Sequence, residues 1–204
     1  MSEGADAQRS DTREEIMGAT YHALKKHGYA NLTMQNIADE FEKSKSLLHY
    51  HYDTKEDLMV AFLEYAIGWL RDAVEEETGD DPEQRLHRFI ERLTLGPGDE
   101  GDWILTLFEL RLQAAHNEAF RERLAAHYEA NRDALADIIA DGVEAGVFHE
   151  DDPQEAAEIL LAALEGGRMA HVTLGLEELS ARTAAGVSGR VVERLKQRPT
   201  GDRK

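Results

Sequence analysis

Apolar residues recur along most of the chain at intervals of three and four residues, which is the spacing of one face of an α-helix. Near the N-terminus, Ile16, Ala19, Ala23 and Leu24 follow this period, and Gly28 then offers the left-handed conformation that ends many helices. Runs of Val, Ile and Thr, the residues enriched in strands, are nearly absent. The pattern therefore predicts an all-α protein.

Residues suited to helix capping divide the chain further. Two short helices are expected at about residues 34–41, after an N-cap at Thr33, and about 45–51, after an N-cap at Ser44. Thr54 and Asp57 resemble a capping box that opens a long fourth helix, running to about residue 77.

Two Asp-Pro pairs mark later helix starts, because each combines an acidic N-cap with proline at the first helical position. The expected long helices begin at residue 82 and then span about 102–115, 118–145, 153–174 and 177–195, with Gly146 and Gly175 as stops. This gives nine helices in total. The change from short to long helices suggests a domain of residues 1–53 and another of residues 54–204.

Several classes of protein are excluded by composition. No stretch of 18 uninterrupted apolar residues occurs, so we expect no membrane span. Residues 1–11 are polar and acidic, unlike a signal peptide, and the chain has no cysteine for disulfides or thiolate metal sites. We therefore expect a cytoplasmic protein.

The charge balance is strongly acidic. There are 41 Asp and Glu against 23 Lys and Arg, and the net charge is −18. Taken alone, this argues against a nucleic-acid partner, because phosphate binding requires basic surface. Many acidic residues with only seven lysines suit a protein that works in molar salt, where the Debye length falls to about 3 Å. We expect a halophilic, haloarchaeal source, and an ordinary acidic cytosolic protein is the alternative.

The segment 33–58 has the arrangement of a helix-turn-helix, with a short helix, a tight turn and a second short helix. The first helix is expected to bury Ile37 and Ala38, and the second to bury Leu47 or Leu48. Residues 43–52 contain no acidic residue, although they contain two lysines and two histidines. The second helix is therefore expected to face DNA.

These residues resemble a known family. Thr33, Ile37-Ala38, Ser44-Lys45, Leu48, Tyr50, Tyr52 and Lys55 to Leu58 are similar to the DNA-binding domain of the tetracycline-repressor (TetR/AcrR) family. The close similarity covers about residues 12–60, and the rest agrees only in helix order and length. The resemblance implies a nine-helix fold with an N-terminal three-helix domain and a C-terminal helical domain for effector binding and dimerisation.

The resemblance also implies DNA contacts. Lys45, Ser46 and His49 match the groove-facing side of the recognition helix, Tyr50 and Lys55 match phosphate-binding positions, and Thr33 and Gln35 match positions that touch the DNA backbone. The turn departs from the family pattern, because Glu42 and Lys43 replace the usual glycine and apolar residue. We expect Lys43 to reach DNA instead.

An effector cavity and a dimer interface are implied in the same way. The pocket candidates are Trp69, Phe89, Trp103, Leu107, Phe108, Arg111, Tyr128 and Arg168. Taken singly, each aromatic or apolar member could equally be a core residue, and the arginines could meet an anionic head group. The interface candidates are Ile159, Ala163, Val187 and Val191, for which intramolecular packing is the alternative.

The sequence as a whole predicts a ligand-responsive repressor that binds double-stranded DNA as a homodimer, at a palindromic operator, and is released by a small hydrophobic effector. We expect no enzyme activity, cofactor or metal. His49 and His51 are two residues apart on a helix and point in different directions. The rival interpretations are a small helical hydrolase, which no motif supports, and a helical adaptor that no longer binds DNA, which the −18 charge favours.

Overall fold

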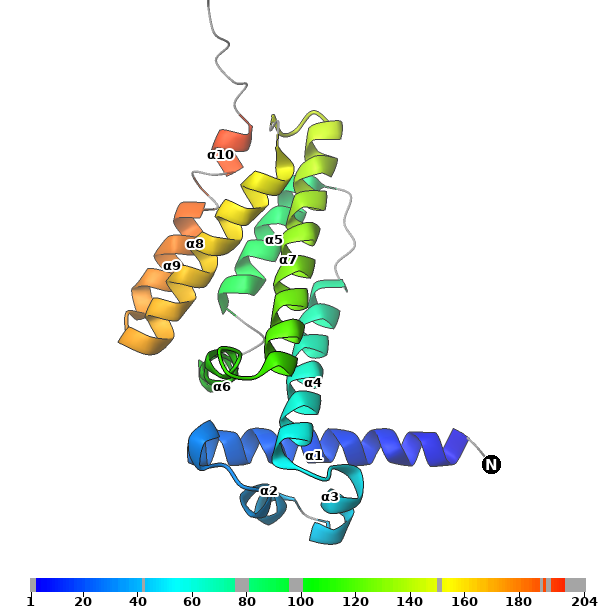
Figure 1. Ribbon diagram of the computed structural model, residues 1–204. Coiled ribbons are helices and arrows are strands. Elements are labelled where there is room, and N and C mark those ends of the chain that lie inside the picture. The colour runs from blue at the N-terminus through cyan, green and yellow to red at the C-terminus, as the bar shows by residue number, and fades with distance from the viewer. Residues whose placement is uncertain are drawn as a thin grey trace, which may run out of the picture. The chain divides into compact units, whose positions relative to one another are not determined.

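The computed structural model describes residues 3–41, 43–75, 81–95, 101–149, 152–187, 189 and 192–196, which form helices and no strand (Figure 1). The helices are α1 (Glu3–Asn31), α2 (Met34–Glu40), α3 (Lys45–His51), α4 (Lys55–Glu75), α5 (Pro82–Leu95), α6 (Gly101–Gln113), α7 (Glu118–Glu144), α8 (Pro153–Leu174), α9 (Glu177–Gly186) and α10 (Val192–Leu195). The predicted all-α class and helix order are confirmed. The ninth expected helix is present as α9 and the short α10.

The predicted helix ends are confirmed at three glycines with positive φ. Gly28 (φ 67°, ψ 161°) interrupts the helical path of α1, Gly146 (φ 71°) follows α7, and Gly175 (φ 66°, ψ 23°) ends α8. At the opposite end of α8, the Asp152 carboxylate accepts the Glu155 N–H at 3.0 Å. The start of α1 differs from expectation, because the helix begins at Glu3, well before the apolar period starts at Ile16.

The chain forms two compact units, each made from two segments. The first unit contains residues 1–69 and 102–124, and the second contains residues 70–101 and 125–204. The expected functional division between residues 53 and 54 stays a prediction. In the first unit the fully buried apolar side chains include Ile16, Ile37, Leu48, Leu58, Phe62 and Phe120, so α1 to α4 share one core with the start of α7.

The second unit has its own apolar core, made by α5, α7, α8 and α9. Its buried members include Leu86, Ile90, Leu135, Ile139, Phe148, Leu160 and Leu164. Gly167 of α8 lies directly against Thr183 of α9, and a Cβ at Gly167 would stand 2.9 Å from the Thr183 Oγ1. The lack of a side chain at Gly167 therefore lets α8 and α9 approach closely at this point. Arg85 and Asp141 join α5 to α7 by an ion pair of 2.5 Å.

None of the helices that the structure describes combines the length and the apolar character needed to cross a lipid bilayer.

The turn after α7 gives a test of the packing in the second unit. The chain folds back so that Val147 and Phe148 both donate N–H groups to the Gly142 carbonyl, at 2.8 and 2.9 Å. The buried Phe148 ring then covers Gly142, where a Cβ would overlap it. Gly142→Ala should lower the free energy of unfolding by about 2 kcal/mol, measured by chemical denaturation.

The matched control is Gly18→Ala in α1, where an added Cβ meets nothing within 4 Å. This change should raise the free energy of unfolding by about 0.5 kcal/mol, because alanine favours helix over glycine. Equal stability of Gly142→Ala and wild type would contradict the packing described for the turn.

Candidate DNA-binding site

Two N-caps set the positions of the short helices α2 and α3. The Thr33 hydroxyl accepts the Asn36 N–H at 3.1 Å, and the Asn36 side-chain oxygen accepts the Thr33 N–H at 3.0 Å, forming a reciprocal capping box. The Ser44 hydroxyl accepts the Leu47 N–H at 3.3 Å and caps α3. Both predicted caps are confirmed.

The helix α3 has one fully buried side chain. Leu48 is fully buried, whereas Leu47 is only partly buried at the edge of the same core. In α2, Ile37 is fully buried and the small Ala38 is half-buried beside it. The core thus holds one side of each helix and leaves the other side to solvent.

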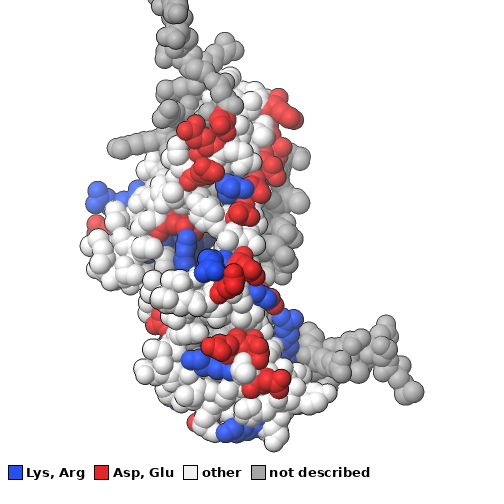
Figure 2. Space-filling model, viewed as in Figure 1, with Lys and Arg blue, Asp and Glu red and all other residues white. Residues whose placement is uncertain are grey.

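The solvent face of α3 carries the predicted contacts. Lys45, Ser46 and His49 are exposed, and Tyr50 is 77% exposed, which is unusual for a large aromatic side chain. No acidic residue occurs in α3. The space-filling view shows Lys and Arg side chains lying beside Asp and Glu side chains over much of the visible surface (Figure 2), whereas α3 has basic but no acidic side chains. Such a face can approach phosphate without repulsion.

Lys45 and Gln35 form a polar bridge between α3 and α2. The Lys45 ammonium donates to the Gln35 side-chain oxygen, and the Gln35 amide donates to the Asp39 carboxylate at 2.6 Å. Both residues were predicted DNA contacts, and the structure places them side by side on exposed surface. The bridge orients Lys45 without burying its charge.

Lys43 has a partner that the sequence did not indicate. Its ammonium forms an ion pair of 2.5 Å with the Glu15 carboxylate of α1, and both side chains are partly exposed. The turn residue is thus tied to α1 by charge, where the family pattern has an apolar residue. To make the predicted DNA contact, Lys43 would have to leave the Glu15 carboxylate and bind DNA in its place.

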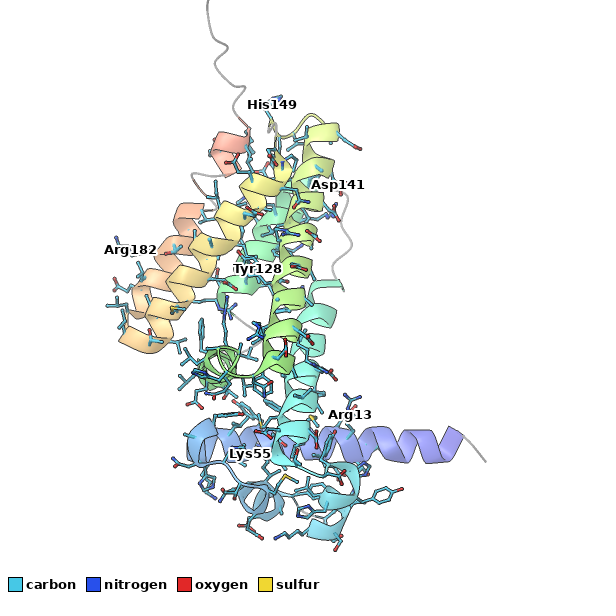
Figure 3. The ribbon with its side chains drawn as sticks, in the orientation of Figure 1. Arg13, Lys55, Tyr128, Asp141, His149 and Arg182 are labelled. Atoms are coloured by element: carbon cyan, nitrogen blue, oxygen red, sulfur yellow. The ribbon has the colours of Figure 1, made fainter. Side chains whose placement is uncertain are left out.

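Lys55 is committed to contacts within the protein. Its ammonium donates to the main-chain carbonyls of Tyr29 and Leu32, at 3.3 and 3.0 Å, and lies 4.6 Å from the centre of the Tyr29 ring (Figure 3). The phosphate contact of Lys55 stays a prediction. In the structure, Lys55 connects the start of α4 to the end of α1 through these hydrogen bonds. The Thr54 hydroxyl caps α4 by accepting the Asp57 N–H at 3.1 Å.

The segment after Gly28 is also held from α6 and α7. The Tyr29 N–H donates to the Glu109 carboxylate of α6 at 3.0 Å, and the Tyr29 ring packs edge-on against Phe120 of α7. Burial raises the pKa of the Tyr29 hydroxyl, and the nearby Glu56 charge adds to this. Sequence reasoning missed Glu109, because a contact across 80 residues leaves no local signal.

Tyr52 resembles Tyr29 in its surroundings. Burial raises the pKa of the Tyr52 hydroxyl, although the positive charge and hydrogen bond of Arg13 act in the opposite direction. Tyr52 ends α3 through an N–H bond to the Leu48 carbonyl at 3.0 Å. Tyr52 therefore packs within the domain, and Tyr50 is the exposed member of the pair.

The effector-pocket candidates are distributed over both compact units. Leu107, Phe108 and Arg111 belong to the first unit, and Phe89, Tyr128 and Arg168 belong to the second. Phe89 and Phe108 are buried, and Arg168 donates to the Leu93 carbonyl near the end of α5 at 2.8 Å. The side chains of Trp69 and Trp103 lie outside the described residues.

An unexpected hollow of about 400 Å³ lies at the turn between α8 and α9. Gly175, Leu176, Glu178, Leu179 and Arg182 line it, and none of them was a candidate.

The interface candidates have different environments. Ile159 is 60% exposed on α8 and Ala163 is exposed one turn later. Val187 is only 6% exposed and packs in the core of its own unit, and Val191 lies outside the described residues.

Four exposed apolar residues of α8 and α9 were missed: Met169, Leu174, Leu176 and Leu179. The stripe that holds the candidates Ile159 and Ala163 continues at helical spacing to Gly166 and Met169, and this continuation was the signal that could have extended the predicted face.

The role of Lys55 can be tested by Lys55→Met, which keeps an unbranched apolar side chain but removes the ammonium. Loss of two hydrogen bonds from a charged donor should lower the free energy of unfolding by about 2 kcal/mol, measured by chemical denaturation. Lys45→Met is the control, and should change stability by less than about 0.5 kcal/mol because Lys45 is exposed. Equal effects of the two changes would contradict the fastening role.

Comparisons with known proteins agree with this geometry. Residues 82–196 match the family model for the C-terminal part of BetI-type transcriptional repressors, and residues 16–62 match the model for bacterial regulatory proteins of the tetR family. The chain is 21% identical over 175 residues to the HTH-type transcriptional repressor AcnR of Corynebacterium glutamicum, covering 86% of this chain and 89% of AcnR.

Solved structures have the same fold. A TetR transcription regulator from Haloarcula marismortui is 38% identical, with a TM-score of 0.87, and the match covers 92% of this chain and 100% of that one. A transcriptional regulator from Saccharomonospora viridis in complex with choline is 23% identical, with a TM-score of 0.78, over 89% and 97% of the two chains. With its helix-turn-helix and its repressor-type C-terminal region, the chain belongs to the TetR family of transcriptional regulators, which are DNA-binding proteins and not enzymes.

Proposed function

We propose that this repressor binds a palindromic operator as a homodimer and leaves it when a small hydrophobic effector binds. The exposed, acid-free face of α3 is the observation that carries the proposal. A helix of this kind enters the major groove, and a symmetric pair of such helices reads two half-sites about 34 Å apart. The two-fold symmetry of the protein is then matched by that of the operator.

The proposed contacts divide by chemistry. Lys45, Ser46 and His49 offer donors to base edges, since they share the exposed side of α3. The exposed hydroxyl of Tyr50 and the partly exposed start of α2, with Thr33 and Gln35, suit phosphate and sugar contacts. Lys43 and Lys55 already have partners within the chain, so their contacts with DNA would need rearrangement.

The homodimer is supported by the exposed apolar face of α8 and α9. Ile159 is 60% exposed, Leu174 is 69% exposed and Met169 is 48% exposed. Exposed apolar residues that gather into one patch mark interaction surfaces. A seven-residue recognition helix also offers too few contacts for specific binding by one subunit. We infer that a second copy of the chain covers this face, so that the dimer presents two copies of α3 to DNA.

The effector is proposed to bind in the C-terminal region, whose match to a repressor family extends over residues 82–196. Phe89 and Tyr128 belong to the apolar core of this region, and Arg168 donates one hydrogen bond to the Leu93 carbonyl near the end of α5. A hydrophobic molecule suits such a lining. The choline complex of the Saccharomonospora viridis protein makes a small organic cation the second candidate.

DNA binding can be tested on an operator selected from a random-sequence duplex library with the purified protein. Combined Lys45→Ala and Tyr50→Ala substitutions should weaken operator binding by at least about a hundredfold, because each lost contact costs about 1–3 kcal/mol. Fluorescence anisotropy measures the affinity, and size-exclusion chromatography with light scattering checks that the assembly is unchanged.

A control pair at Arg121 and Glu118, an exposed i, i+3 ion pair of α7, should leave operator affinity unchanged when both are replaced by alanine. Failure of the wild-type protein to select any duplex, at any KCl concentration from 0.1 M (a Debye length of about 10 Å) to 1 M (about 3 Å), would refute the proposed function.

The dimer can be tested by Ile159→Glu. A carboxylate in an apolar interface is costly to desolvate, so the change should convert the protein from twice 22.9 kDa to a single 22.9 kDa chain in light scattering. Leu112→Glu on α6 is the matched control, because Leu112 is 71% exposed and lies outside the proposed interface. A dimer that persists in Ile159→Glu, or is lost equally in Leu112→Glu, would contradict the assignment of this face.

A further inference from the structure

Four lysines of the N-terminal region have partners of two kinds. Lys43 pairs with the Glu15 carboxylate at 2.5 Å and Lys26 pairs with the Glu40 carboxylate at 2.7 Å. Lys45 and Lys55 instead donate to neutral oxygens, of the Gln35 amide and of main-chain carbonyls. The difference matters for DNA binding, because only a carboxylate becomes an unpaired charge when its lysine leaves.

The kind of partner that a lysine leaves can be measured through the salt dependence of DNA binding. A lysine that neutralises one phosphate displaces condensed cations, and the logarithm of the binding constant then falls with the logarithm of salt concentration by about 0.9 per contact. If the lysine leaves a carboxylate to make this contact, the carboxylate takes up a cation in turn. The two terms have opposite signs, so the contact adds less to the salt dependence than a contact made by a lysine with a neutral partner.

We propose that Lys43 exchanges Glu15 for a backbone phosphate on binding DNA, and that this exchange makes its contact less dependent on salt than a contact by a lysine with a neutral partner. The inference rests on the proposed DNA contact of Lys43. The geometry supports an exchange, because Lys43 and Glu15 are 35% and 48% exposed and an exposed ion pair is weak. Lys45, whose partner is neutral, supplies the ordinary salt-sensitive contact.

Glu15 is then a positioning residue that tunes the salt dependence of binding. It acts through Lys43 and needs no contact with DNA. In a chain with a net charge of −18, such exchanges preserve affinity at salt concentrations that would release an ordinary basic protein from DNA.

The test measures binding of a fluorescein-labelled 30-base-pair duplex of random sequence by anisotropy, at KCl concentrations from 0.1 to 1 M (about 3 to 10 Å of Debye length). The variants are Glu15→Gln, Lys43→Gln and their combination. Glu14→Gln is the matched control, since it makes the same charge change at the neighbouring exposed position of α1. Thermal unfolding of each variant confirms that it is folded.

Glu15→Gln should steepen the log–log slope relative to wild type, by at most about 0.9, because the lysine contact now releases a cation without a compensating uptake. Glu14→Gln should leave the slope unchanged. Lys43→Gln should weaken binding with little change of slope, and adding it to Glu15→Gln should remove the steepening.

Equal slopes for Glu15→Gln and Glu14→Gln would overturn the inference, as would steepening that persists without Lys43. Lys45→Gln separates this result from failure of the proposed function. If Lys45→Gln flattens the slope by about 0.9, α3 binds DNA whatever Glu15 does. If neither wild type nor Lys45→Gln shows salt-dependent binding, the proposed function and this inference fail together.

Discussion

The burial of Leu48 is the interaction on which the rest of this structure depends. The helix that carries it, α3, has seven residues, and a helix of that length is not stable alone in water. Burying the Leu48 side chain stabilises it by about 2 kcal/mol, and the Ser44 cap adds about 1 kcal/mol. The recognition face exists because its opposite side is held in the core of the first unit.

The end of α1 has a comparable role for the polar contacts. Gly28 adopts a positive φ that changes the direction of the chain. The segment that follows, Tyr29 to Leu32, then contacts three other helices. Lys55 of α4 binds its carbonyls, Glu109 of α6 accepts its N–H, and Phe120 of α7 packs against the Tyr29 ring. Residues that are far apart in sequence thus contact the same short segment at the end of α1. These contacts fix the position of the start of α4 relative to the helix-turn-helix.

The acidity of the chain changes how its basic residues work. With 41 acidic residues, a lysine on the surface readily finds an acidic partner, and Lys43 and Lys26 have done so. α3 is different because it contains no acidic residue, and its Lys45 is oriented by an amide. In the proposed function, DNA binding by so acidic a protein depends on this one helix, which carries no acidic residue of its own.

The sequence by itself determined the helices, most of their ends and the helix-turn-helix formed by α2 and α3. Caps at Thr33, Ser44 and Asp152 and stops at Gly28 and Gly175 are local signals, since each depends on a few neighbouring residues. The outward position of Lys45 and Tyr50 follows equally from helical periodicity. Only the tertiary structure decided that Lys43 pairs with Glu15, that Lys55 holds the end of α1, and that Val187 is core rather than surface. The physical reason is that partner choice and burial depend on which helices pack together, and contacts such as Tyr29 with Glu109, 80 residues apart, leave no trace in any local pattern.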